Sequence, residues 1–394
     1  MYSKKRVRNL LIVTTDLQHP AYHRIDMFVP YIKESFNVVI FDIRKKMRFD
    51  SLILRDIFNL IKLYSNLMIG IIPPTGVIRF VIPIPIPGAL ILAFIFVPRL
   101  LKRIARQINP IIWAIGPFAG YCVILSKEKK LFIYDDNDRH YLLQKNRFIR
   151  SFVKSIEYAC LLNADAVTVS GFNLERDCKS LRGQNSKVVL IPNSVDVDLF
   201  QFDEYTDRIF DLIYVGLLDE WSGLHLVLEA IGLMNIKKRP SLLIVGPVVN
   251  LEYKKKLCNI MSKFGLKENI FFTGRIAHNE VVRYLRKSSI GLATFPKIDL
   301  MKYVLPLKLV EYMSCGLAVI ASNVGDTAEI VKLSECGVVV EAEPVHISKA
   351  ISCLLRNRDL LQYYGTQGRS YVLKNFNLKL VAHRLISFIS NLVK

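Results

Sequence analysis

Residues 290–321 read IGLATFPKIDLMKYVLPLKLVEYMSCGLAVIA, and they carry the strongest structural signal in the chain. The apolar start predicts a buried strand, and a polar loop follows that ends at Pro306. Proline suits the first helical position, so we expect a short helix over residues 307–315 that Gly316 ends. A second buried strand is expected over residues 318–321. This order belongs to a parallel sheet, where ligands bind at the carboxyl ends of the strands.

The start of this predicted helix is suited to an anion. Its free N–H groups and the positive end of its dipole favour a phosphate, and Lys308 adds a full positive charge beside them. Glu311 follows one turn later on nearly the same face, where its carboxylate could accept ribose hydroxyls. The alternative is an ordinary surface pair of Lys308 and Glu311, worth roughly 0.2–0.5 kcal/mol.

The composition indicates a folded protein of two domains that binds anions. The chain has 394 residues, 52% of them hydrophobic, and a formal net charge of +20. Such a charge favours nucleotide diphosphates, acidic lipids or nucleic acid as partners. Because the chain contains no aromatic RNA-binding run and no paired zinc ligands, we expect no nucleic acid partner.

The cysteines and the first residues favour a cytoplasmic protein. The seven cysteines are scattered without C-x-x-C spacing, which argues for a reducing compartment and against a disulfide framework or a zinc site. The start, MYSKKRVRNLLIVTTD, has too short an apolar core for a signal peptide. We therefore expect a first strand over residues 9–14.

The first half alternates strands and helices but has no G-x-G-x-x-G turn, so an ordinary dinucleotide fold is not supported. Arg24 is expected where the first strand opens into a cleft. The alternative is an ordinary solvated residue at the start of a helix. A strand over residues 131–134 ends in a dense titratable cluster: Asp135, Asp136, Asp138, Arg139 and His140. An aspartate there could take a proton from an acceptor hydroxyl, or hold a side chain that contacts a diphosphate. The alternative role is a helix N-cap.

Residues 67–98 are the most apolar part of the chain, but Arg79 and six prolines exclude a continuous membrane-spanning helix. We expect a strand over residues 77–82 and a helix over residues 88–108. Lys102, Arg103 and Arg106 stand beside apolar residues of this helix. Two interpretations remain open: a segment lying on an anionic membrane, and an internal helix with a basic flank.

Four segments in the second half resemble family-4 glycosyltransferases of the GT-B fold: residues 214–216, 244–246, 272–275 and 306–316. The run IPNSVD at residues 191–196 resembles the segment that joins the two domains of these enzymes. Asp219-Glu220-Trp221 resembles the branch with teichuronic-acid-type and xanthan-type transferases. The resemblance implies an α/β fold of two Rossmann-like domains facing each other across a cleft. It implies an acceptor-binding domain over residues 1–200, a nucleotide-sugar-binding domain over residues 201–375, and a final helix over residues 376–394 that packs back on the first domain.

The resemblance also implies a function: sugar transfer from a UDP- or GDP-sugar to a lipid-linked or envelope-glycan acceptor. We expect this at the inner membrane face, with the basic N-terminal domain on the anionic surface, and with neither cofactor nor metal. The expected catalytic residues are Lys308, Asp135, Asp138 and Arg24. The expected donor-binding residues are Gly216, Trp221, Gly246, Arg275, Tyr303, Pro306, Leu307, Lys308 and Glu311.

The chain departs from the family pattern at three positions. Leu217 and Ser222 stand where most members carry an Arg and a Lys that grip the diphosphate, and Tyr303 replaces the first Glu of the E-x7-E motif. These changes leave the sugar and the stereochemical course open. Two alternatives follow: a nucleotide-sugar epimerase or hydrolase that uses Asp135, Asp138 and His140, and a protein that binds nucleotide without turnover.

Overall fold

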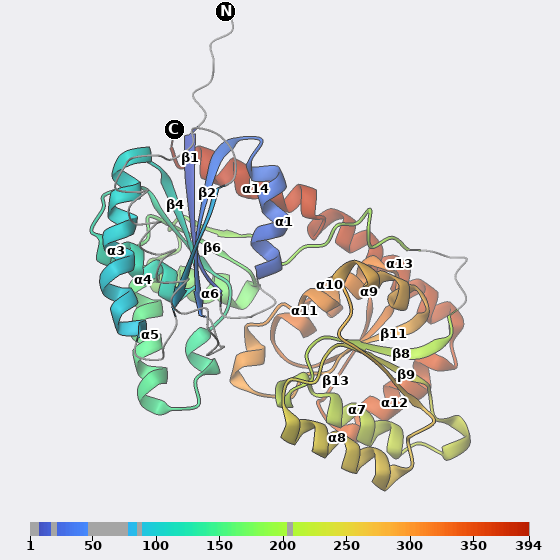
Figure 1. The fold of residues 1–394 in the computed structure, drawn as a ribbon. Coiled ribbons are helices and arrows are strands. Elements are labelled where there is room, and N and C mark those ends of the chain that lie inside the picture. Colours follow the sequence, from blue (N-terminus) through green and yellow to red (C-terminus); the bar gives the residue numbers. More distant parts are fainter. Residues whose placement is uncertain (1–7, 17–21, 46–77, 85–88, 203–207, 394) are drawn as a thin grey trace, which may run out of the picture. The chain divides into compact units, whose positions relative to one another are not determined.

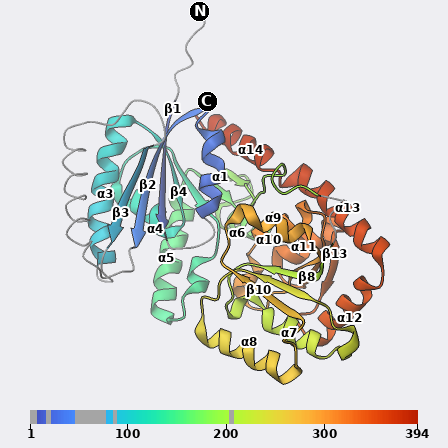
Figure 2. The same cartoon turned by 45° about the vertical axis from the view of Figure 1, so that its right-hand side comes forward.

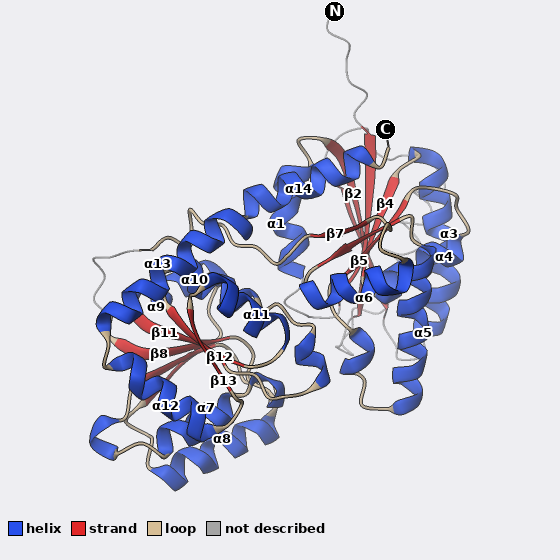
Figure 3. Cartoon of the chain, turned by 180° about the vertical axis from the view of Figure 1, so that it is seen from behind, coloured by secondary structure: helices blue, strands red, loops and turns tan. Residues whose placement is uncertain are grey.

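The computed structural model describes residues 8–16, 22–45, 78–84, 89–202 and 208–393 (Figure 1). The chain divides into two compact units, one of Met1–Ile191 with Ala382–Lys394 and the other of Pro192–Val381. In each unit parallel strands alternate with helices along the chain (Figure 3), so the predicted α/β class with two Rossmann-like halves is confirmed.

The described part of the first unit holds a seven-stranded parallel sheet in the order β3-β2-β1-β4-β5-β6-β7, part of which is seen in Figure 2. Its strands are β1 (Arg8–Asp16), β2 (Phe36–Lys45), β3 (Ile78–Ile84), β4 (Ile111–Ile115), β5 (Phe132–Asp136), β6 (Ala166–Val169) and β7 (Val188–Leu190). Its helices are α1 (Tyr22–Ile32), α3 (Ala89–Ile108), α4 (Pro117–Ser126), α5 (Arg147–Asn163) and α6 (Phe172–Arg182), with a 3-10 turn, η1 (His140–Leu143).

Helix α3 bears on the choice between a membrane-surface segment and an internal helix. Leu101 and Ile104 are 1% and 0% exposed, since their spacing turns them toward the core of the unit. Arg99 and Arg106 point outward and are exposed. The apolar side of this basic stretch is therefore used inside the protein, which favours the internal helix. The apolar run over residues 67–77 and the predicted helix start at residue 88 lie outside the described residues. Within the described ranges, no helix has the length and apolarity needed to span a bilayer.

The second unit has a six-stranded parallel sheet in the order β10-β9-β8-β11-β12-β13 among its described residues. Its strands are β8 (Phe210–Val215), β9 (Leu242–Val245), β10 (Ile270–Gly274), β11 (Ser288–Ala293), β12 (Ala318–Ser322) and β13 (Gly337–Val340). Helices α7 (Leu224–Gly232), α8 (Leu251–Phe264) and α12 (Pro344–Leu355) cover one face (Figure 3). Helices α9 (His278–Arg286), α10 (Leu307–Ser314), α11 (Gly325–Ser334) and α13 (Arg358–Asn375) cover the other. Short 3-10 turns are η2 (Glu220–Ser222), η3 (Ile236–Lys238) and η4 (Asp299–Lys302).

The prediction for residues 290–321 is confirmed. Strand β11 leads through a loop and η4 into α10, and β12 follows and pairs with β11 in parallel, Ile290 opposite Ala318. Pro306 is the extended N-cap of α10, and Gly316 ends the helix with a φ of 67°. Helix α14 (Leu378–Asn391) closes the chain, and its residues from Ala382 onward belong to the first unit.

Candidate functional site

The carboxyl edge of the second sheet carries a row of glycines. Gly216 follows β8 and Gly246 follows β9, while Gly274 ends β10. Backbone bonds tie them together: the Gly216 N–H donates to the carbonyl of Val245, and the Gly246 N–H donates to the carbonyl of Gly274. A Cβ on Gly246 would lie 2.0 Å from the Gly216 carbonyl oxygen. The backbones of neighbouring loops therefore approach as closely as only glycine allows.

Lys308 lies at this edge. The side chain is buried, with 9% of the residue exposed, and its Nζ has no hydrogen-bond partner among the described residues. The ammonium is 3.8 Å from the centre of the Tyr214 ring and 5.2 Å from that of Phe295. A Cβ on Gly216 would lie 3.2 Å from Nζ, so the cation rests against the Gly216 backbone. The two rings offer a weak cation–π attraction, but they do not replace an anion.

The environment of Lys308 disfavours its charge. Burial lowers the pKa of Lys308 to about 7, although the nearby Glu311 carboxylate opposes the shift. A buried ammonium without an acceptor is costly, and an anion that accepts its hydrogen bonds would restore the charged form. The surface-pair interpretation of Lys308 and Glu311 is wrong, since both are buried and the Lys308 ammonium has no hydrogen-bond partner among the described residues. Burial, and an Nζ that has no partner in the described part of the chain, suit Lys308 to an anionic ligand.

Glu311 is held by a residue that no sequence motif singled out. Its Oε1 lies 2.5 Å from Nε2 of His278, the first residue of α9, and Glu311 is 2% exposed. This hydrogen bond raises the pKa of His278, although partial burial opposes the shift. The His278 ring also lies 5.3 Å from that of Phe200. His278 stands four residues after the end of β10, and that place in a parallel sheet is the signal that could have found it.

Two further polar atoms at this edge lack a protein partner in the described part of the chain. They are the hydroxyls of Thr294, directly after β11, and of Ser322, the last residue of β12. Both residues are buried, at 0% and 1% exposure. Buried polar atoms are nearly always hydrogen-bonded in folded proteins, so unsatisfied groups gathered at one sheet edge point to a ligand.

The remaining predicted donor residues surround this edge. Trp221 is half-buried in η2, Arg275 is exposed directly after β10, and Tyr303 is half-buried directly after η4. Pro306 and Leu307 form the start of α10. Ser222, one of the departures from the family pattern, is fully buried and donates to the Tyr253 hydroxyl at 3.1 Å. Its hydroxyl therefore serves the core of the second unit.

In the first unit, the predicted cluster follows β5 but its members differ in burial. Asp135 is 0% exposed, and one of its oxygens accepts a hydrogen bond from Thr168 on β6. Asp138 is half-exposed, and its carbonyl oxygen is 2.9 Å from Nδ1 of His140. The His140 ring lies against Gly116 at the end of β4. Arg24 belongs to α1, but its side chain is outside the described part of the structure.

Asp136 and Arg139 belong to a buried ion network. The Arg139 guanidinium is 2.6 Å from Asp136 and 3.3 Å from Glu157 on α5. Burial raises the pKa of Asp136, and burial together with the nearby Asp136 raises the pKa of Glu157 to about 8. The network fixes the loop after β5 to α5. No sequence pattern pointed to Glu157, because it lies inside a helix far along the chain from the aspartates.

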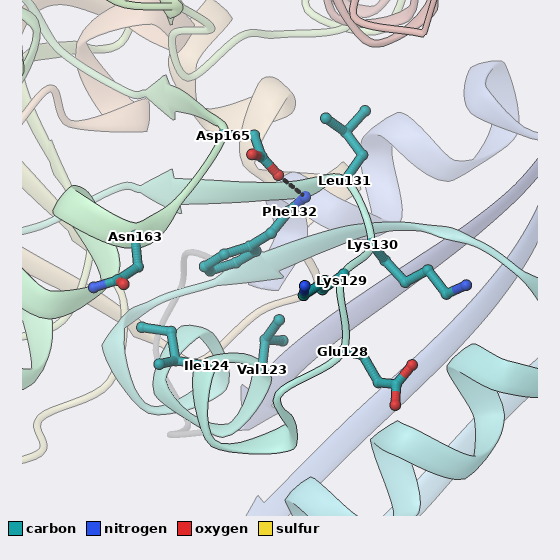
Figure 4. Close-up of a pocket in the computed structure, with 9 residues that line it drawn as sticks. All are labelled: Val123, Ile124, Glu128, Lys129, Lys130, Leu131, Phe132, Asn163 and Asp165. Carbon is teal, nitrogen blue, oxygen red and sulfur yellow. Dashed lines mark hydrogen bonds between the residues drawn. The ribbon is translucent and has the colours of Figure 1, made fainter.

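A hollow of about 560 Å³ lies at the opposite end of β5, beside its first residue, Phe132 (Figure 4). Val123 and Ile124 of α4 line it together with the polar residues Glu128 and Lys130. This is the amino edge of the sheet, away from the predicted site residues.

Comparison with known proteins shows a family match in the second half of the chain and similarity to two glycosyltransferases. The family described as "Glycosyl transferases group 1" matches residues 199–371, which include every donor-binding residue predicted above. Residues 199–371 thus belong to the group 1 glycosyltransferase family. It is 24% identical to an uncharacterized glycosyltransferase of Methanocaldococcus jannaschii over 64% of this chain and 60% of that protein. It is also 24% identical to TuaH of Bacillus subtilis, a glycosyltransferase assigned to teichuronic acid biosynthesis, over 48% of this chain and 47% of that one.

The match to each of these relatives spans less than two thirds of the relative's length. Among solved structures, HepE of Anabaena in complex with UDP superposes with a TM-score of 0.75 and 14% identity, covering 97% of this chain and all of that one. At this identity the superposition shows the fold, and the predicted GT-B fold is confirmed.

Proposed function

We propose that this protein transfers a sugar from a UDP- or GDP-sugar to a lipid-linked or envelope-glycan acceptor at the inner face of the membrane. The family gives the reaction class, and HepE, a protein of the same fold, was crystallised with UDP and with UDP-glucose. The second unit would hold the donor and the first unit the acceptor.

One observation carries the proposal: the buried ammonium of Lys308, which has no partner among the described residues. The donor diphosphate would accept its hydrogen bonds while the start of α10 adds backbone N–H groups and the helix dipole. Transfer leaves a nucleoside diphosphate whose charge grows as the glycosidic bond breaks. A cation fixed in advance beside that charge stabilises the transition state more than the ground state.

Glu311 would hold the ribose of the donor. One of its oxygens contacts His278, and the other would accept a hydroxyl. The glycines at 216 and 246 would let the diphosphate approach the backbone. A side chain at Gly216 would fill the space next to Lys308, and one at Gly246 would displace the Gly216 backbone. Arg275, Trp221 and Tyr303 would line the outer part of the donor site.

For the acceptor we favour Asp138 over Asp135 as the residue that takes the hydroxyl proton. Asp138 is half-exposed, whereas Asp135 is fully buried and accepts a hydrogen bond from Thr168. Asp135 would then position the loop after β5. Arg24 stays a candidate for a second contact with the diphosphate.

The test is thermal unfolding with and without UDP-glucose, GDP-mannose, UDP or GDP. A ligand at a hundred times its Kd adds about 2.7 kcal/mol to the free energy of unfolding. We expect one of these ligands to raise Tm for the wild type and for Lys349→Met, a control at an exposed lysine on α12. The same ligand should raise Tm much less for Lys308→Met and Glu311→Ala. Equal shifts in all four proteins would refute the donor site.

A second candidate is nucleotide binding without turnover, favoured by Ser222, whose buried hydroxyl donates to Tyr253 where most members place a diphosphate-binding lysine. Release of nucleoside diphosphate in the presence of membrane extract separates the two functions. Thermal stabilisation by the donor with no release across acceptors would support the binding protein.

A further inference from the structure

The first turns of α5 form an apolar surface that nothing in the described structure covers. Phe148 is 87% exposed, Phe152 is 55% exposed and Ile149 is 50% exposed. Neighbouring η1 adds Leu143 at 41%. Figure 1 shows α5 extending past the carboxyl ends of the strands of its own unit. Soluble proteins seldom leave two phenyl rings on one helix this exposed without a partner.

The helix is amphipathic over these turns. At 3.6 residues per turn, Phe148, Ile149 and Phe152 share one side, which continues into the buried Ile156 further along α5. Arg147, Arg150 and Lys154 lie on the opposite side and are exposed. The apolar side of α5 thus packs on the core near Ile156 and continues, exposed, over the first turns of the helix.

The surrounding charge has one sign. Residues 139–156 contain five Lys or Arg and no Asp or Glu. Four of these cations, Lys145, Arg147, Arg150 and Lys154, are exposed. Large aromatic side chains beside cations, without an acidic residue among them, complement an anionic lipid surface: the rings enter the acyl boundary and the cations reach the head groups.

We propose that the start of α5, with Phe148, Ile149 and Phe152 inserted, docks this protein on an anionic lipid bilayer. Helix α3, for which a membrane-surface segment and an internal helix were both open, buries Leu101 and Ile104 in its basic stretch, while Ile95 and Phe96 nearer its start are 43% and 61% exposed. Helix α5 instead follows β5 through η1, so the docked surface is joined directly to Asp138 and His140. The inference rests on the proposed function. It adds the residues that would hold the first unit at the bilayer, where a lipid-linked acceptor lies.

The test is co-sedimentation of the protein with vesicles of two compositions. One is phosphatidylcholine alone, and the other contains about 30% phosphatidylglycerol, so that the comparison measures the effect of anionic lipid on binding. We expect binding only to the anionic vesicles. The double variant Phe148→Ser/Phe152→Ser should lower the partition coefficient at least about tenfold, because two rings no longer leave water. Arg147→Glu/Arg150→Glu should lower it comparably.

The matched controls come from η3, where Ile236 is 72% exposed beside Lys237 and Lys238. Ile236→Ser removes an exposed apolar side chain, and Lys237→Glu/Lys238→Glu makes the same change of net charge as the arginine variant. Both controls should sediment with the vesicles like the wild type.

Three outcomes would overturn the proposal. The phenylalanine variant could bind vesicles like the wild type. It could convert a dimer into a monomer in sedimentation velocity, which would make the surface an interface between copies. It could lower Tm by several degrees, which would show that the rings are packed within the chain. The thermal shift with donor is measured on the same variants, so loss of donor binding and loss of membrane binding are told apart.

Discussion

Nε2 of His278 lies 2.5 Å from Oε1 of Glu311, and this contact joins the first turn of α9 to the middle of α10. The carboxylate is almost fully buried, so the histidine is what fixes its orientation. A carboxylate that must meet ribose hydroxyls benefits from such a support, because its rotamer is set before the ligand arrives. His278 is in this sense a positioning residue for the donor.

The first prediction concerns this support. His278→Ala leaves a buried carboxylate oxygen without its donor, so the affinity for the nucleotide sugar should fall by about tenfold, the cost of one charge-assisted hydrogen bond. His278→Gln keeps an amide donor and should restore most of the affinity. Isothermal titration with the stabilising donor measures both. Equal loss in the two variants would indicate that His278 acts through packing alone.

The second prediction concerns the stability of the protein without ligand. Lys308→Met replaces a buried ammonium by an apolar side chain of similar length between Tyr214 and Phe295. The free energy of unfolding at pH 7 should therefore stay the same or rise, while stabilisation by the donor is lost. Urea unfolding with and without donor measures this. A clear loss of stability in the variant would mean that the lysine already has a favourable partner in the free protein.

The third prediction is a pH dependence from the same lysine. Burial lowers its pKa from the ordinary value of 10.5 to about 7 in the folded protein, so the unfolded chain binds more protons between these two pH values. The contribution of Lys308 to the free energy of unfolding should rise with pH across this range, by at most about 1.4 kcal/mol per pH unit. Subtracting the profile of Lys308→Met from that of the wild type isolates the contribution. A flat difference would contradict the lowered pKa.

The fourth prediction follows from the change in charge on binding. A diphosphate beside Lys308 favours the ammonium, so at pH 8 binding of UDP-glucose or GDP-mannose should take up close to one proton for each ligand bound. Nucleotide sugars have no phosphate that titrates near this pH, so Lys308 is the main group expected to take up the proton. Titration calorimetry in buffers of different ionisation enthalpy counts the protons. Any variant of Lys308 that still binds should take up fewer.

Much of this site could be predicted from the sequence, for physical reasons that act locally. Helix α10 begins after Pro306, because proline fixes an extended or early helical backbone. It ends at Gly316, because glycine adopts a positive φ. Apolar runs on either side predict the buried strands β11 and β12. The topology of parallel strands alone predicts that Lys308 and Glu311 lie at the carboxyl end of the sheet.

The rest depends on contacts between segments far apart in the chain. The burial of Lys308 comes from Tyr214 on β8 and from Phe295 after β11, and no local pattern announces those contacts. His278 on α9 meets Glu311 on α10, although the two residues are 33 positions apart in the sequence. The buried ion network of Arg139 likewise needs Glu157 from α5. Helix α3 was ambiguous because an amphipathic helix looks the same to a membrane and to a protein core.

The last prediction tests the close approach of the loops at the donor edge. A Cβ on Gly246, whose φ is 140°, would lie 2.0 Å from the carbonyl oxygen of Gly216, so Gly246→Ala must displace the backbone that faces Lys308. Gly265 at the end of α8 also has a positive φ, of 62°, but nothing lies within 4 Å of the position of its Cβ. Gly265→Ala should thus cost only the left-handed strain of about 1 kcal/mol, whereas Gly246→Ala should cost more than about 3 kcal/mol and abolish donor binding. Urea unfolding of the two variants compares them directly, and equal costs would show that the loops separate without penalty.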